Sequence, residues 1–299
     1  MIIDKKKIRV VCSLTTIPDI LKNNKKEFEK MLDTLINIFD DVYLGIPKIS
    51  NITKKPYPKF NYKSVKIVEL EKDYGPICKI LGALKHEKDP NTYIVTVDDD
   101  NKYTLNLKEF IKKSIIKYPN DVCTIAGIIV DKSIFSSIFI KLAPIFLFFF
   151  SNICFDNNAY YIYSLYGKYY KNNKYLTILS GFPGCIYPRK VIKKDFYKFF
   201  KRHTKIKDIF LNDDVLLSAY LAKHKINRIN ANYYFKKETF DGEIEKNYNL
   251  HLDILFTKRL FNAYSLLYDE CFSKDNYNQS IITGPYLIIL IVLIMKLFL

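Results

Sequence analysis

The sequence predicts an α/β protein with one open, mostly parallel sheet, flanking helices and an apolar C-terminal segment. Short apolar runs rich in Val and Ile alternate with amphipathic segments through the first 130 residues, a pattern typical of strand–helix–strand units. The chain has 299 residues, 49% of them hydrophobic, enough to bury the core of one large domain. Polar stretches with Gly or Pro separate the apolar runs. We therefore expect the domain to cover residues 1–275.

Strands are expected wherever a short continuous apolar run lies between turn signals. The expected strands in the first half cover residues 8–14, 41–47, 65–70, 92–97 and 122–130. Helices are expected where apolar residues recur at helical spacing, as Phe28, Met31 and Leu35 do. The expected helices cover residues 24–39, 77–88, 105–119 and 211–225. A strand, a glycine turn and a second strand are expected within 176–192, and one more strand at 226–230.

Charge and cysteine content narrow the function classes. Lys and Arg number 47 against 31 acidic residues, a net charge of +16 spread along the chain. No zinc-finger, basic-helix or RNA-recognition signature accompanies this charge, so we expect no nucleic-acid partner. Six scattered cysteines form no C-x-x-C pair, which argues against a zinc site and favours buried free thiols in a reducing compartment.

The C-terminal stretch 281–299 is almost wholly apolar. As a helix it would span roughly 28 Å, against about 30 Å for the hydrocarbon core of a bilayer. It predicts a membrane anchor, single-pass or at the tail, with the catalytic domain in the cytoplasm. A buried C-terminal helix is the alternative, but such a helix should show a polar stripe, and none is visible.

Three consecutive aspartates, Asp98, Asp99 and Asp100, follow the strand expected at 92–97. Two carboxylates about 5 Å apart repel by roughly 3 kcal/mol at an effective dielectric near 20. Such a group favours a hard cation, Mg²⁺ or Mn²⁺, which would neutralise a departing diphosphate. A solvated turn is the alternative, since Asp is a common turn former.

A second acidic pair, Asp213 and Asp214, opens the helix expected at 211–225. Acids favour the first turn of a helix, and Asn212 suits the N-cap, so helix capping explains this pair by itself. The order of motifs along the chain favours a functional role for the pair over helix capping alone. An apolar strand ending in Asp-x-Asp is followed, about a hundred residues later, by a glycine turn and then the acidic pair.

This order of motifs resembles the nucleotide-sugar-dependent glycosyltransferases of the GT-A fold, within them the family-2-like group. The resemblance covers roughly residues 8–230. It is carried by "VVCSLTTIP", "YGPICKILGAL", "VTVDDD", and "GFPGCIYPRKVI" followed by "NDDVLLSAYL". It implies the Rossmann-like GT-A sheet. One departure stands out: this chain has Asp-Asp where Glu-Asp is usual, which leaves the assignment between Asp213 and Asp214 open.

The resemblance also implies roles for particular residues. Asp214 would be the general base, with Asp213 as the alternative. Asp100 would bind Mn²⁺ or Mg²⁺, together with Asp98 and, as a third ligand, His251. Residues implied to contact the nucleotide sugar are Ser13, Thr15, Thr16, Asp73, Lys79, Asp98, Asp99, Gly181 and Gly184.

The sequence thus predicts a metal-dependent, inverting glycosyltransferase. It would move a sugar from a nucleoside-diphosphate sugar to a hydroxyl of a glycan, protein or lipid acceptor. Two alternatives stay open. One is a sugar-phosphate nucleotidyltransferase, which would use the same metal chemistry. The other is a non-catalytic, membrane-attached binding module on a GT-A scaffold, in which Asp98, Asp100 and Asp214 would not converge on one cleft.

Overall fold

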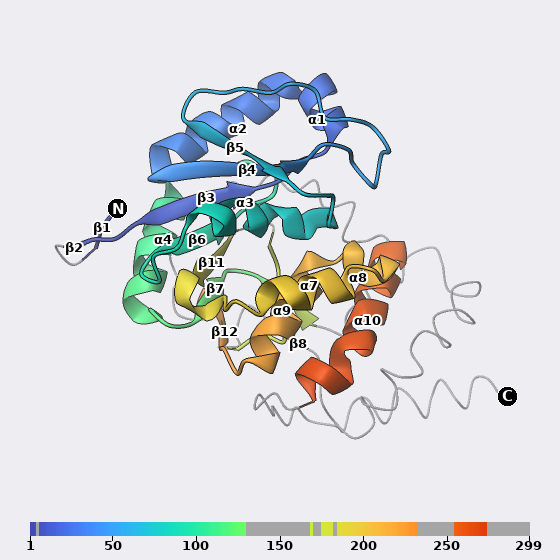
Figure 1. The fold of residues 1–299 in the computed structure, drawn as a ribbon. Helices are drawn as coiled ribbons and strands as arrows, with labels where there is room; N and C mark the ends of the chain where they lie inside the picture. The colour runs from blue at the N-terminus through green and yellow to red at the C-terminus, as the bar shows by residue number, and fades with distance from the viewer. Residues whose placement is uncertain (4–5, 130–167, 170–174, 182–183, 232–253, 274–299) are drawn as a thin grey trace, which may run out of the picture.

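A seven-stranded sheet forms the centre of the computed structural model, which describes residues 1–3, 6–129, 168–169, 175–181, 184–231 and 254–273 (Figure 1). Its strand order is β12-β7-β11-β6-β3-β4-β5. All neighbours are parallel except β11, which is antiparallel to both β6 and β7. The strands are β3 (Val10–Leu14), β4 (Asp41–Pro47), β5 (Val65–Leu70), β6 (Tyr93–Thr96), β7 (Val122–Thr124), β11 (Cys185–Pro188) and β12 (Arg228–Asn230). The predicted mostly parallel α/β sheet is confirmed.

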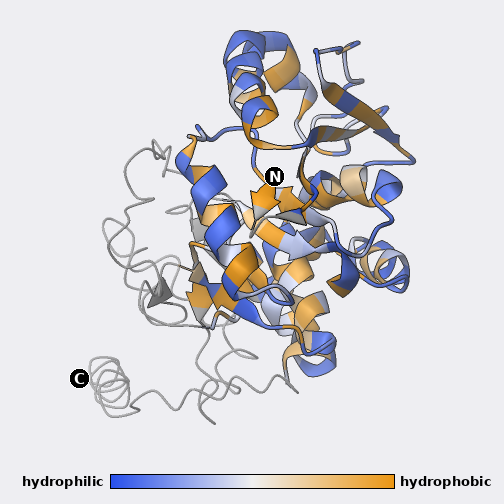
Figure 2. Cartoon of the chain, turned by 90° about the vertical axis from the view of Figure 1, so that its left-hand side faces the viewer, coloured by the Kyte–Doolittle hydropathy of each residue, from blue (hydrophilic) through white to orange (hydrophobic). Residues whose placement is uncertain are grey.

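Helices cover both faces of this sheet (Figure 1). One face carries α1 (Pro18–Asn23), α2 (Lys25–Ile38) and α4 (Asn106–Lys117). The other carries the 3₁₀ turn η1 (Gly75–Ile77), α3 (Cys78–His86), α7 (Phe196–His203), α8 (Lys207–Phe210), α9 (Asp213–Lys223), α10 (Ile254–Leu267) and the π-helical turn η6 (Tyr268–Phe272). In Figure 2 the helices alternate between hydrophilic and hydrophobic residues, as amphipathic helices on a sheet do.

Burial on both faces explains why the strands read as continuous apolar runs. Along β3, Val10, Cys12 and Leu14 pack with α2 and α4, whereas Val11 packs with α3. A strand enclosed in this way has no solvent face on which to place polar residues. For this reason the predicted limits 41–47 coincide with β4, which is buried along nearly its whole length. The predicted limits 65–70 also coincide with β5, but β5 is an edge strand on which Lys66, Ile67 and Glu69 are exposed.

The strand predicted at 122–130 is wrong as one element. β7 ends at Thr124, and β8 (Gly127–Ile129) lies in a separate three-stranded sheet, between β9 (Lys168–Tyr169) and β10 (Ile178–Leu179). The chain changes sheets at Gly127, where a Cβ would come within 2.5 Å of the Ile178 carbonyl oxygen. Glycine permits this close approach, and an apolar run does not reveal such a break.

Several elements went unpredicted. These are the hairpin of β1 (Ile2–Ile3) and β2 (Lys6–Lys7), the turn η2 (Arg189–Val191), and the helices α1, α7, α8 and α10. Helix α7 had a sequence signal, because Phe196, Phe199, Phe200 and His203 recur at helical spacing and are all buried.

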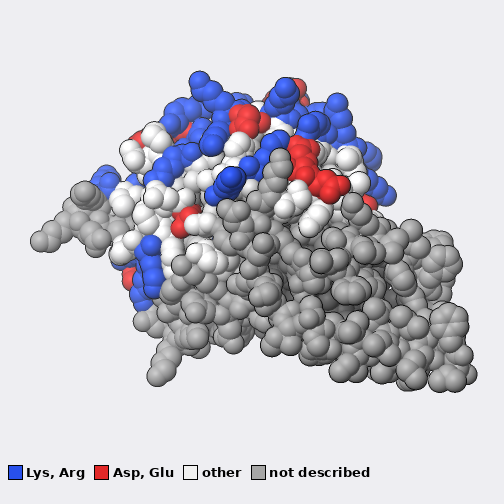
Figure 3. Space-filling model, turned by 90° about the horizontal axis from the view of Figure 1, so that it is seen from below, with Lys and Arg blue, Asp and Glu red and all other residues white. Residues whose placement is uncertain are grey.

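Within the described ranges, no helix is long and apolar enough to cross a membrane. This finding corrects the predicted membrane-associated, single-pass or tail-anchored localisation. The segment 281–299, from which that prediction came, lies outside the described residues. The five cysteines that the structure describes are free and buried, as predicted. Lys and Arg are spread over the described part of the face in Figure 3, with acidic and uncharged residues between them.

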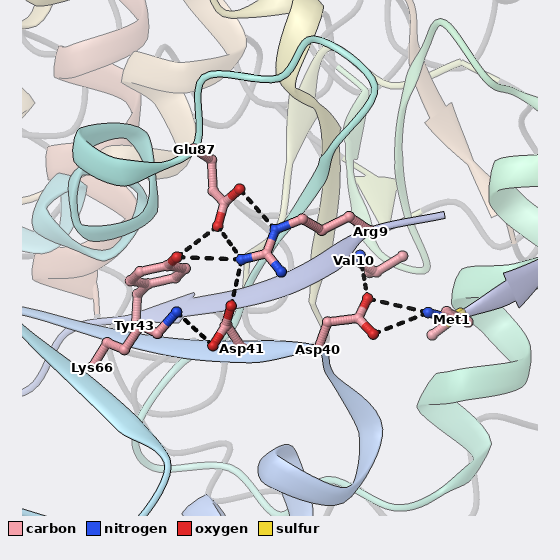
Figure 4. Close-up of polar contacts among 8 residues, drawn as sticks. All are labelled: Met1, Arg9, Val10, Asp40, Asp41, Tyr43, Lys66 and Glu87. Carbon is pink, nitrogen blue, oxygen red and sulfur yellow. Dashed lines mark hydrogen bonds and ion pairs between the residues drawn. The ribbon is translucent and has the colours of Figure 1, made fainter. Parts of the chain in front are cut away.

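At the amino ends of the strands, five side chains form what we call the Arg9 cluster (Figure 4). Arg9 donates to Glu87, with Nε–Oε2 at 3.0 Å and Nη2–Oε1 at 2.6 Å, and also to Asp41. Tyr43 donates to Glu87 at 2.6 Å, and Lys66 pairs with Asp41 at 2.7 Å. The cluster joins the starts of β3 and β4 to the end of α3.

Candidate active site

Two of the predicted acidic motifs meet at the carboxyl edge of the sheet, on opposite sides of one lysine. Lys79 lies in the first turn of α3, Asp98 follows β6, and Asp213 opens α9. The Lys79 Nζ donates to Asp98 Oδ1 and lies 2.9 Å from Asp213 Oδ2. The Lys79 side chain is only 6% exposed. In open α/β sheets, ligands bind beyond the carboxyl ends of the strands.

Asp214 joins this group through the glycine turn. The Gly181 amide donates to Asp214 Oδ1 at 3.0 Å. A Cβ on Gly181 would come within 2.8 Å of that oxygen and 3.2 Å of the Lys79 Nζ. A larger residue at this position would therefore have to displace the Asp214 carboxyl group. We call Lys79, Asp98, Asp213, Asp214 and Gly181 the Lys79 cluster.

The electrostatics of the Lys79 cluster are unbalanced, with three carboxyl groups around one ammonium. Burial raises the pKa of Asp214 well above its usual range, and the charge of Asp213 raises it further, against the opposing effect of Lys79. Burial would lower the pKa of Lys79, but the charges of Asp213, Asp98 and Asp214 outweigh burial and raise it. Lys79 is therefore an ammonium, and Asp214 holds a proton more tightly than an ordinary aspartate.

The predicted alternative for the acidic pair, capping by Asn212, is not what the structure shows. Asn212 makes no side-chain cap hydrogen bond to α9; its Nδ2 donates instead to the Asp208 carbonyl at 2.6 Å. Both acids do lie in the first turn, where the helix dipole stabilises negative charge.

Tyr103, a residue that was not predicted from the sequence, holds the backbone of Asp98 in place. The Asp98 amide donates to the Tyr103 hydroxyl at 2.8 Å, and that hydroxyl donates back to the Asp98 carbonyl at 3.2 Å. Tyr103 is buried, and nothing in the sequence distinguishes it from other core tyrosines. Asp99 follows Asp98 in the chain. Burial raises the pKa of Asp99 to about 7, and the charges of Asp100 and Asp98 raise it as well.

The predicted nucleotide-contacting residues near β3 make contacts within the protein. The Ser13 hydroxyl donates to the Lys79 carbonyl and accepts from the Ala83 amide at 3.1 Å, which fixes the start of α3 against β3. The Thr15 hydroxyl donates to the Gly45 carbonyl at 2.7 Å. These contacts position the loop after β3, and nucleotide binding by these residues stays a prediction.

The next group of predicted contacts also orders loops. The Thr16 carbonyl accepts from the Tyr57 hydroxyl at 2.7 Å. Asp73 accepts from the Asn51 amide at 2.6 Å and from the Gly75 amide at 2.7 Å.

Gly184 has a φ of +102°, in the left-handed region that favours glycine, and closes the turn that begins at Gly181.

Of the other two predicted metal ligands, the structure describes one, Asp100. Asp100 is exposed and accepts from the Asn101 side chain at 3.1 Å. His251 lies outside the described residues. In the part of the chain that the structure describes, no three His, Cys, Asp or Glu side chains are grouped so that they could hold a metal.

Two carboxylates nevertheless have the chemistry for a divalent cation. Mg²⁺ commonly binds one or two carboxylates plus substrate phosphates, without a full protein cage. Asp213 Oδ2 is buried and accepts no hydrogen bond of acceptable geometry, although the Lys79 Nζ is 2.9 Å away. A divalent ion about 3 Å from that ammonium would be repelled by roughly 11 kcal/mol at an effective dielectric near 20. The ion and the ammonium therefore exclude each other from the space between Asp98 and Asp213.

Comparisons with known proteins found no matching family model and no matching curated protein. Among solved structures, the chain is similar to 2-C-methyl-D-erythritol 4-phosphate cytidylyltransferase from Francisella tularensis, at 13% identity and a TM-score of 0.38, over 75% of this chain and 89% of the other. It is also similar to 4-diphosphocytidyl-2C-methyl-D-erythritol synthase from Anaerococcus prevotii, at 15% identity and a TM-score of 0.34, over 67% and 78%.

A third similar structure is HddC from Yersinia pseudotuberculosis, at 12% identity and a TM-score of 0.32, over 62% of this chain and 79% of the other. Structural similarities with TM-scores this low do not indicate which ligand this chain binds or which reaction it catalyses.

Proposed function

We propose that the chain is a transferase that takes the sugar of a nucleoside-diphosphate sugar, with Asp214 as the general base. One observation carries the proposal: Asp214 is a carboxyl of raised pKa, held by the Gly181 amide next to Lys79 at the carboxyl edge of the sheet. A base is most effective when its pKa lies near the working pH, and burial moves an aspartate in that direction.

The proposed reaction is one displacement at the anomeric carbon of the sugar. An acceptor hydroxyl attacks that carbon while its proton passes to Asp214. The bond from the carbon to the diphosphate oxygen breaks, and its electron pair leaves with the diphosphate, so the configuration inverts. Mg²⁺ or Mn²⁺ bound through Asp98 and Asp213, with Asp100 as a further predicted ligand, would supply charge for the departing diphosphate. The acceptor remains, as predicted, a glycan, protein or lipid hydroxyl.

Nucleotidyl transfer to a sugar phosphate is the second candidate. In that reaction a phosphate oxygen attacks the α-phosphorus of a nucleoside triphosphate, and pyrophosphate leaves. The observation that favours it is the buried ammonium of Lys79, because it suits a substrate with several phosphate oxygens. Against the non-catalytic alternative, the charges of Asp98 and Asp214 both act on the buried Lys79. Asp100, the third aspartate of that test, is exposed.

A direct assay separates the two reactions. The full chain is incubated with UDP-, GDP-, CDP-, ADP- and TDP-sugars, and release of the nucleoside diphosphate is measured. In parallel, pyrophosphate release is measured from nucleoside triphosphates and sugar phosphates. We expect the first reaction, at a rate that rises with pH as Asp214 loses its proton, with a midpoint above that of an ordinary aspartate.

Two variants connect the activity to the site. Asp214→Asn should lower kcat by about 10² to 10⁴, the range for loss of a general base. Asp195→Asn is the matched control, because Asp195 pairs with Tyr220 and His224 outside the Lys79 cluster. Equal activity in the wild type and in Asp214→Asn would contradict the proposal, and pyrophosphate release alone would favour the second candidate.

A further inference from the structure

Lys79 occupies the space that a divalent cation would need. Its Nζ donates to Asp98 Oδ1 and lies within ion-pair distance of Asp213 Oδ2, which accepts no hydrogen bond. The contact with Asp213 is therefore electrostatic. A divalent cation would attract that oxygen more strongly than an ammonium does, because it carries two charges.

Of the groups in this contact, the ammonium is carried by the longest and most flexible side chain. Asp213 is buried at the start of α9, and the backbone of Asp98 is held on both sides by the Tyr103 hydroxyl. Ser13 fixes the main chain of Lys79, but the ammonium is at the end of a flexible stem of four methylenes. Gly181 leaves open the space next to the Nζ, which any larger residue would fill.

We propose that Lys79 is an exchangeable counter-ion, which gives up Asp98 and Asp213 to a divalent cation that arrives with a diphosphate, and then turns to the diphosphate oxygens. The proposal rests on the proposed function, since that supplies the diphosphate. A divalent cation alone must displace the ammonium without offering it another partner. When a cation and a diphosphate bind together, the diphosphate oxygens become the new partner of the Lys79 ammonium. The binding of the cation and the binding of the diphosphate are therefore coupled.

Linkage makes this coupling measurable in the wild-type chain. If a nucleoside diphosphate strengthens Mn²⁺ binding by some factor, Mn²⁺ must strengthen the binding of that nucleotide by the same factor. Free Mn²⁺ is followed by its electron paramagnetic resonance signal, and UDP, GDP, CDP, ADP and TDP are titrated by calorimetry. We expect weak Mn²⁺ binding alone and at least a tenfold gain in the presence of the nucleotide that binds.

Removal of the ammonium should free the carboxylates for the metal. Lys79→Ala is expected to bind Mn²⁺ alone at least tenfold more tightly than the wild type, and Mn²⁺ should raise its Tm. Adding Asp98→Asn should abolish both gains. Lys66→Ala is the matched control, because Lys66 also pairs with an aspartate, Asp41 at 2.7 Å, but outside the Lys79 cluster. It should leave Mn²⁺ binding unchanged.

Either of two results would overturn the proposal: wild-type Mn²⁺ affinity that no nucleotide changes, or a folded Lys79→Ala that binds Mn²⁺ no better than the wild type. If Lys79→Ala does not fold, the wild-type coupling decides. Failure of all five nucleotides to bind would overturn the proposed function and the diphosphate half of this inference. Exchange between the ammonium and the metal would then still be decided by Mn²⁺ binding to Lys79→Ala.

Discussion

The same sheet carries two clusters of charged side chains, one at each edge, and they are balanced differently. The Arg9 cluster, at the amino ends of the strands, sets two cations, Arg9 and Lys66, against two carboxylates (Figure 4). The Lys79 cluster, at the carboxyl ends, sets one cation against three carboxyl groups. The first can neutralise itself with its own side chains, and the second cannot.

The pKa shifts follow this difference. Burial would raise the pKa of both Asp41 and Glu87, but the hydrogen bonds that each accepts outweigh burial and lower it. At the other edge, burial raises the pKa of Asp214, and the charge of Asp213 adds to the effect. In the network that stabilises the fold, each charged group is paired with a group of opposite charge. Uncompensated carboxyl groups at the carboxyl ends of the strands are instead typical of functional sites, and the proposed function uses them in that way.

The largest expected effect comes from removing the central cation of each cluster. Lys79→Met should lower the free energy of unfolding by about 3 to 5 kcal/mol, because it leaves a largely buried carboxylate pair without its counter-ion. Arg9→Met should cost about 1 to 2 kcal/mol, since the Arg9 side chain is 39% exposed and water can replace part of its contacts. Urea unfolding measures both, and equal losses would contradict the comparison.

The glycine turn tests how tightly the Lys79 cluster is packed. Gly181→Ala should destabilise by about 2 to 3 kcal/mol, because its Cβ would meet Asp214 Oδ1 at 2.8 Å. Gly184→Ala is the matched variant: its nearest neighbour atom would be 3.5 Å away, so only the cost of its positive φ remains, about 1 kcal/mol. Thermal unfolding compares them, and a larger loss at Gly184 would show that backbone strain outweighs packing.

The smallest effects should have opposite signs at the two edges. The pKa of Glu87 is lowered in the folded state, so its stabilising contribution is present at neutral pH and is lost as the pH falls through that pKa. Glu87→Gln should therefore cost about 1 kcal/mol at pH 7 and nothing in acid.

The pKa of Asp99 is raised to about 7, so the folded state binds the proton more tightly than the unfolded state. Wild-type stability should then fall as the pH rises from about 4 to 7, and Asp99→Asn should be relatively more stable at pH 8 than at pH 4. Urea unfolding across this range measures both variants. If Glu87→Gln instead raised the free energy of unfolding at pH 8, the Arg9 cluster would not stabilise the fold as described.

The sequence by itself determined the class of the sheet and most of its strands. Strand β4 was predicted with the limits it has, because a strand buried on both faces has to be a continuous apolar run. The half-exposed edge strand β5 was also predicted with its own limits, 65–70. The acidic motifs were found as well, since they interrupt apolar patterns at the end of β6 and the start of α9. Neither result depends on contacts between distant segments.

Only the tertiary structure decided which of these residues meet. It brought Lys79 between Asp98 and Asp213, brought Asp214 to the Gly181 amide, and left Asp100 exposed. It also divided the run at 122–130 between two sheets. The physical reason is that local pattern reports burial and backbone preference. Contacts between a strand end, a helix start and a turn depend on strand order and on how the helices pack against the sheet.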